Sequence, residues 1–210
     1  MSMHELTQND EDNLVFMVEI IRQMNARGEN PGTGGNYSYR PEKSKGDFLM
    51  ISESGVDKGV FGREHFIGID EKGEVLPLWQ KPGRKSSAET GLHLMAYEET
   101  NANCVLHSHS LESLWFCDLF PGKDLIDITG LEMIKAITGF TTHEETLYIP
   151  VFENSQDIAS LSEKARKTIR HAPGFLIRGH GLTCWGNSVW EAKRHLETFN
   201  YLFQYFTKRS

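Results

Sequence analysis

The chain has 210 residues, enough for a full hydrophobic core, and we expect a single domain over residues 1–210. Its formal net charge of −7 argues against a nucleic-acid-binding protein, because no basic stripe is available to neutralise phosphates. No apolar run approaches the roughly 18 residues of a membrane span, so no membrane association is expected. The three cysteines lack paired spacing, which indicates reduced thiols and a cytoplasmic protein.

Helical and strand patterns interleave along the chain. In chain order they predict a helix over 10–26, a strand-like alternation over 37–40, a strand over 47–52, a hairpin of 66–69 with 74–76, a helix over 87–100, a strand over 102–107, a helix over 110–118, a strand over 124–128, a short helix over 130–137, a strand over 146–149, a helix over 155–170, a strand over 175–178 and a terminal helix over 188–207. Ser87 is the candidate N-cap of the helix over 87–100. The interleaving indicates an α/β or α+β protein, and the hairpin favours a mixed or antiparallel sheet.

The pair of His107 and His109 is the most informative feature of the sequence. The two residues end an apolar run and are separated only by Ser108, and side chains two apart on a strand point to the same face. A third histidine, His180, stands between two glycines just after the apolar run 175–177. A single strand-end histidine is more often structural than metal-binding. The set of three, however, matches the protein ligands of a catalytic zinc site that keeps one position open.

Two carboxylates are candidate acids or bases for such a site. Glu89 and Glu132 both lie in segments that begin with turn-forming residues. The alternative is that each is an ordinary first-turn glutamate, which favours a helix N-terminus by about 0.3–1 kcal/mol. The sequence pattern leaves both interpretations open.

Three loops are suited to binding an anion, because glycine-rich turns and helix starts expose backbone N–H groups. Each loop is also compatible with an ordinary turn or cap. Their candidate residues are Gly34, Gly35, Asn36, Ser54, Gly55, Ser86 and Ser87. Five further histidines have no partner in the sequence and are expected to be structural or on the surface: His65, His93, His143, His171 and His195.

Together these motifs resemble the class II aldolase/adducin family. The matching segments follow the family's order and cover nearly the whole chain: residues 33–38, residues 51–55, Ser86–Ser87 with Glu89, residues 107–110 and residues 179–181. The likeness is strongest to the family's sugar-phosphate dehydratases. It rests there on Lys58–Gly59, Glu132–Lys135, Ile149–Phe152 with Gln156–Ile158, and Leu176–Leu182.

The resemblance implies a three-layer α/β/α sandwich with a central, mainly antiparallel sheet, and a ring-shaped homotetramer. It implies one Zn²⁺ per subunit on His107, His109 and His180. It places the acid/base glutamate of the dehydratases at Glu132 and the catalytic glutamate of the aldolases at Glu89. The substrate phosphate is expected on Gly34, Gly35, Asn36, Ser54, Gly55, Ser86 and Ser87.

The activity implied by the resemblance is zinc-dependent loss of water from a 2-keto sugar phosphate in methionine salvage. An aldolase or 4-epimerase acting on another ketose phosphate is the main alternative, because the same metal-held enediolate can lead to C–C cleavage. A non-catalytic interaction module, as in adducin-like domains, is the second alternative. Such a module would not need the metal ligands, and all three are present here.

Overall fold

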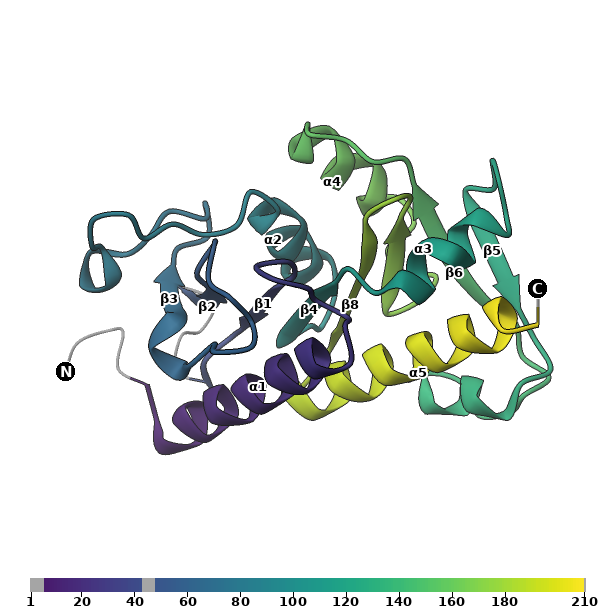
Figure 1. Cartoon of the computed structure of the whole chain (residues 1–210), viewed down its shortest axis with the longest axis horizontal. Helices are drawn as coiled ribbons and strands as arrows, with labels where there is room; N and C mark the ends of the chain where they lie inside the picture. Colours follow the sequence, from purple (N-terminus) through teal and green to yellow (C-terminus); the bar gives the residue numbers. More distant parts are fainter. Residues whose placement is uncertain (1–5, 43–47, 210) are drawn as a thin grey trace.

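The computed structural model describes residues 6–42 and 48–209. Its strands form one sheet of eight in the order β3-β2-β1-β4-β8-β7-β6-β5 (Figure 1). The strands are β1 (Asn36–Tyr39), β2 (Leu49–Ser52), β3 (Phe66–Ile69), β4 (Cys104–Ser108), β5 (Leu125–Ile128), β6 (Leu147–Phe152), β7 (Gly174–Ile177) and β8 (Gly181–Gly186). Every neighbouring pair is antiparallel except β6 with β7, so the prediction of a mainly antiparallel sheet is confirmed.

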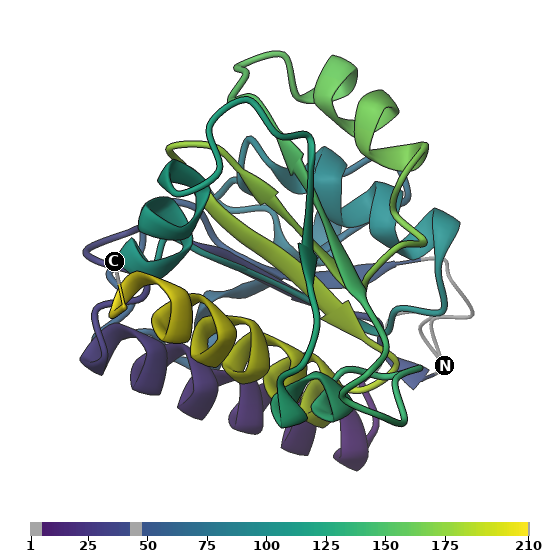
Figure 2. The same cartoon turned by 90° about the vertical axis from the view of Figure 1, so that its right-hand side faces the viewer.

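Helices cover both faces of this sheet (Figures 1 and 2). On one face lie α1 (Gln8–Ala26), α3 (Leu111–Asp118) and α5 (Val189–Thr207), and on the other lie α2 (Thr90–Glu99) and α4 (Ile158–Arg166). Short 3₁₀ helices are η2 (Arg63–His65), η3 (Pro77–Trp79) and η4 (Glu132–Ala136). The predicted three-layer α/β/α sandwich is therefore confirmed. Within residues 6–42 and 48–209, no helix has the length and apolarity needed to cross a membrane.

Strand β4 shows how the two cores position the histidines. Cys104 and Leu106 belong to the core beneath α1 and α5, whereas Val105 belongs to the core beneath α2. The same alternation turns His107 toward the α2 side and Ser108 toward the α5 side. Because both faces of β4 are buried, the strand reads in the sequence as a continuous apolar run.

The sequence patterns missed β8, which lies in the centre of the sheet between β4 and β7. All six of its residues are buried, yet it has a glycine at each end and a threonine inside, so neither alternation nor a long apolar run marks it. The glycine at position 181 is required by packing. A Cβ atom there would lie 1.9 Å from the carbonyl oxygen of Ser108 on the neighbouring strand.

The start of α2 also differs from the prediction. Helix α2 begins at Thr90 with Glu89 as N-cap, and Ser87 is not the cap. The carbonyl of Ser87 instead accepts a hydrogen bond from the N–H of Thr90, in a turn that precedes the helix. The side chain of Glu89 makes no capping hydrogen bond, which leaves its carboxylate free for other partners.

Two other predicted elements are shorter than expected or absent. Helix α4 begins at Ile158, with Asp157 as its N-cap, rather than at residue 155. Residues 74–76 form no strand beside β3, since they contribute only the single bridge of Ile69 with Val75.

We expect Gly181→Ala to lower the free energy of unfolding by more than about 3 kcal/mol, because the new methyl group overlaps a buried backbone carbonyl. Gly122→Ala is the control: its φ of +72° is also positive, as is that of Gly181, but nothing lies within 4 Å of the added Cβ. Urea denaturation of both variants measures the difference. Equal losses would show that the contact with Ser108 is relieved by a small backbone shift.

Candidate metal centre

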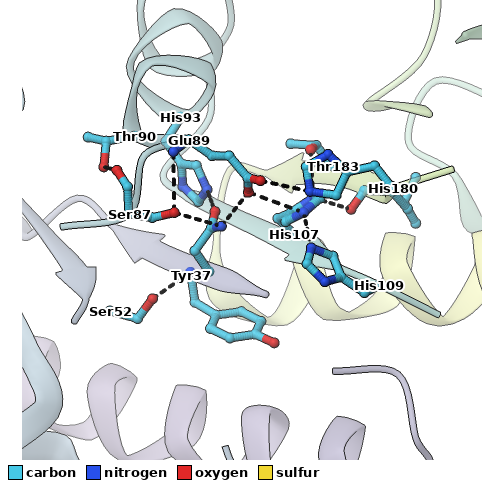
Figure 3. Close-up of polar contacts among 12 residues, drawn as sticks. Tyr37, Ser52, Ser87, Glu89, Thr90, His93, His107, His109, His180 and Thr183 are labelled. Atoms are coloured by element: carbon cyan, nitrogen blue, oxygen red, sulfur yellow. Dashed lines mark hydrogen bonds and ion pairs between the residues drawn. The ribbon is translucent and has the colours of Figure 1, made fainter. Parts of the chain in front are cut away.

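Three imidazoles and one carboxylate converge at one end of the central strands (Figure 3). The potential ligand atoms of Glu89, His107, His109 and His180 all lie within 4.8 Å of one another. The carboxylate of Glu89 joins the group: its Oε2 lies 3.2 Å from His107 Nε2, and its Oε1 lies 2.7 Å from His180 Nε2. The Nε2 atoms of His107 and His109 are 2.9 Å apart. The structure thus brings together the three histidines and one of the two candidate glutamates.

Backbone structure fixes each donor. His107 is the fourth residue of β4, and His109 follows the strand, where its N–H donates to the carbonyl of Glu29. His180 lies in the tight connection between β7 and β8, where its N–H donates to the carbonyl of Ile177. Glu89 stands at the start of α2. The donors therefore come from three elements that are far apart in the sequence.

The hydrogen bonds of His107 define its tautomer. Its Nδ1 lies 3.0 Å from the carbonyl oxygen of Leu182 and 3.0 Å from Thr183 Oγ1. A carbonyl only accepts, so Nδ1 carries the proton and the lone pair of Nε2 points into the cluster. A ring N–H on a backbone carbonyl is the usual arrangement around a metal-binding histidine.

The electrostatics of the cluster suit a cation. Burial lowers the pKa of His107 to about 3 and lowers that of His109 as well, so both rings are neutral donors. Burial alone would raise the pKa of Glu89, but hydrogen bonds from His180 and Asn36 and the proximity of His107 hold it below its ordinary value. Neutral imidazoles and an ionised carboxylate are the protonation states that metal binding requires. The residues present fit a divalent metal ion.

A cavity of about 230 Å³ opens beside the cluster. It is lined by Thr33, Gly34, Gly35, Asn36, Ser52, Glu53, Ser54, Gly55, Ser87, Glu89 and His109. Of the residues expected to bind an anion, only Ser86 is not part of this lining. Three loops distant in sequence thus surround one space next to the metal donors.

The two glycines of the first loop are needed because the loop passes close to the histidines. A Cβ atom on Gly34 would lie 2.9 Å from His109 Nδ1. On Gly35, whose φ is +75°, it would lie 2.8 Å from the carbonyl oxygen of His107 and 2.5 Å from the hydroxyl of Tyr37. Neither position therefore has room for a side chain.

Glu132 does not join the cluster within one chain. Its side chain is 70% exposed on η4, where it pairs with Lys135 at 2.7 Å and His143 at 3.5 Å. Strand β5, which leads to it, ends opposite Leu147 at the start of β6. The metal donors instead lie at the opposite end of the strands, where β7 ends opposite Phe152. The two candidate glutamates thus lie at opposite ends of the strands.

Sequence reasoning missed the role of His93 beside the site. It treated His93 as structural or on the surface, whereas the structure buries it with its Nε2 2.5 Å from Asn36 Oδ1, next to the cluster. A usable signal was present in the sequence. His93 follows Glu89 by four residues, and residues four apart share one face of a helix.

Comparison with known proteins identifies the family. Residues 16–207 match the family described as Class II Aldolase and Adducin N-terminal domain. The chain belongs to this family. Within the class II aldolase and adducin family, the methylthioribulose-1-phosphate dehydratase of Enterobacter sp. (strain 638) is 43% identical over 195 residues, which cover 91% of this chain and 92% of that protein. The protein of the same name from Picosynechococcus sp. (strain ATCC 27264 / PCC 7002 / PR-6) is 37% identical over 207 residues, which cover 97% and 93%.

Solved structures of the class II aldolase family share the fold at low identity. L-fuculose-1-phosphate aldolase from Thermus thermophilus superposes with a TM-score of 0.73 at 19% identity, covering 94% of each chain. A sugar-phosphate aldolase from Thermotoga maritima superposes with a TM-score of 0.67 at 15% identity, covering 96% of this chain and 95% of that one. These likenesses support the predicted sandwich.

We expect His180→Ala to abolish binding of a divalent metal, because it removes one of three imidazoles from the cluster. Equilibrium dialysis against Zn²⁺ and Co²⁺ measures the loss. His171→Ala is the control, since His171 is exposed and belongs to no part of the cluster. Metal binding by the His180→Ala variant at the parent's affinity would remove His180 from the ligand set.

Proposed function

We propose that this protein is a zinc-dependent methylthioribulose-1-phosphate dehydratase. It converts 5-methylthioribulose 1-phosphate to 5-methylthio-2,3-diketopentyl 1-phosphate and water, a step of methionine salvage in the cytoplasm. One observation carries the proposal: the histidine cluster and its glycine-lined cavity occur in a chain that aligns over more than 90% of its length with dehydratases of this name.

Zinc is the proposed metal, one ion per subunit, on His107, His109 and His180. Imidazole nitrogens favour zinc among the hard and borderline divalent ions, and three histidines leave one position for substrate. A Lewis acid at this position supplies polarisation of the C2 ketone, which makes the C3 proton acidic. Glu89 lies against two of these rings and completes the polar wall of the cavity.

The phosphate of the substrate is proposed to bind in the cavity beside the metal. Gly34, Gly35, Asn36, Ser54, Gly55 and Ser87 line that space. The N–H of Gly34 already donates to the carbonyl of Pro31, so the N–H groups of Gly35 and Gly55 are the proposed backbone donors. Oriented backbone N–H groups stabilise a dianion without placing a competing cation next to the metal. Ser86, which precedes the lining residue Ser87, is retained as a proposed contributor on the resemblance alone.

Glu132 is proposed as the acid/base group, contributed by a neighbouring copy in a homotetramer. Within one chain Glu132 is exposed and lies at the other end of the strands from the histidines. An exposed apolar stripe also runs along α3, which begins two residues after His109. It consists of Leu111, Trp115 and Leu119 on and just after α3, which are 53%, 52% and 38% exposed. A contact between two different faces of the chain repeats from copy to copy and can close into a ring.

In this arrangement the Glu132 carboxylate removes the C3 proton as the C3–H bond breaks. The C4–O bond then breaks, and the leaving hydroxyl takes the proton that Glu132 removed and departs as water. The resulting enol tautomerises to the 2,3-diketone, so one water is lost overall. General acid/base catalysis by such a group contributes about 10²–10⁴-fold to the rate.

A class II aldolase or 4-epimerase acting on another ketose phosphate is the second candidate. The observation that favours it is the position of Glu89, which lines the cavity and contacts two metal donors, whereas Glu132 does neither within one chain. A base at Glu89 would suit C–C cleavage. The product of the reaction distinguishes the two candidates.

Purified protein loaded with zinc is expected to convert 5-methylthioribulose 1-phosphate to the diketone, and protein stripped by a chelator is expected to regain this activity when zinc is restored. A panel of other ketose phosphates tests the substrate range, with detection of diketone and of aldehyde fragments. An aldehyde product, lost in Glu89→Gln but not in Glu132→Gln, would replace the dehydratase proposal with the aldolase.

Glu132→Gln is expected to keep zinc but lose turnover, and subunit mixing tests where Glu132 acts. Co-expression with His107→Ala yields mixed rings in which each site takes His107 from one subunit and Glu132 from its neighbour. Both groups are native only when the first subunit is the Glu132→Gln variant and the second is the His107→Ala variant. This is one of four combinations, so about a quarter of the parent activity is expected. Each variant alone is expected to be inactive. Inactive hybrids of confirmed mixed composition would contradict the contribution of Glu132 by a neighbouring copy.

A further inference from the structure

A chain of buried hydrogen bonds leads from the metal cluster into the core, and Figure 3 shows its first part, between Glu89 and His93. The amide nitrogen of Asn36 lies 2.5 Å from Glu89 Oε2 and 3.2 Å from Ser87 Oγ. The amide oxygen of Asn36 faces His93 Nε2 at 2.5 Å. The other ring nitrogen of His93, Nδ1, lies 2.7 Å from Ser38 Oγ. The chain ends at Tyr97, whose hydroxyl lies 2.8 Å from Ser38 Oγ.

The ionised carboxylate of Glu89 sets the direction of every bond in this chain. A carboxylate only accepts, so Asn36 presents its NH₂ group to Glu89 and its oxygen to His93. His93 must then carry its proton on Nε2 in order to donate to that oxygen. Its Nδ1 is left as an acceptor for the hydroxyl of Ser38, and the hydroxyl of Tyr97 donates to Ser38 in turn. Burial lowers the pKa of His93, and with a neutral ring no other assignment satisfies all of these contacts at once.

Burial makes these directions matter. His93 is 1% exposed, Ser38 0%, Asn36 5% and Tyr97 5%. A buried polar group without a partner costs about 1–3 kcal/mol, so water cannot cheaply replace a missing link. The two ends of the Asn36 side chain are almost equal in shape, and packing therefore cannot decide which end faces Glu89. The hydrogen-bond partners at the two ends of the amide decide it together: the Glu89 carboxylate accepts from the NH₂ group and His93 donates to the oxygen.

The geometry also connects the elements that carry the metal donors. Asn36 lies directly opposite His107 in the register of β1 with β4. His93 lies on α2, one helical turn beyond Glu89, and Tyr97 lies a further turn along the same helix. The hydrogen bonds from Asn36 and Ser38 therefore join β1 to α2, and β1 pairs in turn with β4, which carries His107.

We propose that His93, Ser38 and Tyr97 are positioning residues, which hold the Asn36 amide with its NH₂ group toward Glu89 and thereby keep the Glu89 carboxylate turned into the metal cluster. Without His93, the amide oxygen of Asn36 loses its donor, and the amide is no longer held in the orientation that donates to Glu89. This inference rests on the metal centre of the proposed function, but not on the proposed substrate.

Metal binding in the absence of substrate tests the proposal. In His93→Leu we expect the affinity for Zn²⁺, measured by competition with a chelating dye, to fall about 10–100-fold, the usual effect of losing an outer hydrogen-bond partner. The absorption bands of bound Co²⁺ are expected to shift, because they report the arrangement of its ligands. His93→Gln is expected to restore much of both signals, since its amide can donate to Asn36 and accept from Ser38.

Two buried tyrosines provide a matched pair. Tyr97→Phe removes only the final donor of the chain and is expected to change the Co²⁺ spectrum in the same direction as His93→Leu, by a smaller amount. Tyr39→Phe is the control: Tyr39 is 4% exposed and its hydroxyl donates to Asp10, outside this chain of hydrogen bonds. It is expected to lower the melting temperature without altering the Co²⁺ spectrum or the affinity for Zn²⁺.

The proposal is overturned if His93→Leu, folded by circular dichroism, keeps the parent's Co²⁺ spectrum and Zn²⁺ affinity. If His93→Leu does not fold, the tyrosine pair decides, and equal spectra for Tyr97→Phe and Tyr39→Phe would overturn it. A shifted Co²⁺ spectrum in a protein that dehydrates no ketose phosphate would support the positioning role while removing the proposed substrate.

Discussion

The carboxylate of Glu89 holds together the parts of the chain on which the candidate chemistry depends. Its two oxygens reach His107 on β4 and His180 between β7 and β8, from the first residue before α2. A buried anion is costly unless donors or a cation compensate it. Here an amide of β1 and two imidazole rings surround it, so the helix start is tied to three adjacent strands of the sheet centre.

Close backbone packing keeps these donors in place. Gly34 and Gly35 allow the first loop to approach the rings, and Gly181 allows the strand after His180 to lie against the end of β4. The backbone of β8 then accepts a hydrogen bond from His107 Nδ1. Donors fixed by strands and by short hydrogen bonds lose little freedom when a ligand binds, which is what a preorganised site requires.

The sequence predicted the features that depend on local spacing. The two-residue period of a strand was enough to place His107 and His109 on one face, and the resemblance supplied the sandwich. The strand at 181–186 and the contact of His93 with Asn36 escaped prediction, because both depend on neighbours far away in the sequence. The residue pattern alone could not rank Glu89 and Glu132, because both follow turn-forming residues, and the resemblance favoured Glu132. Only the strand register shows that they lie at opposite ends of the strands.

The surroundings of Glu132 in a single copy are unfavourable for its proposed role as the base. The hydrogen bond from Lys135 lowers the pKa of the exposed Glu132 carboxyl below its ordinary value. A carboxylate in that state accepts protons weakly, and a general base works best when its pKa lies near the working pH. Removing water from around a carboxylate raises its pKa. Packing of η4 against the metal centre of a neighbouring copy would therefore place Glu132 near the substrate and strengthen it as a base in the same step.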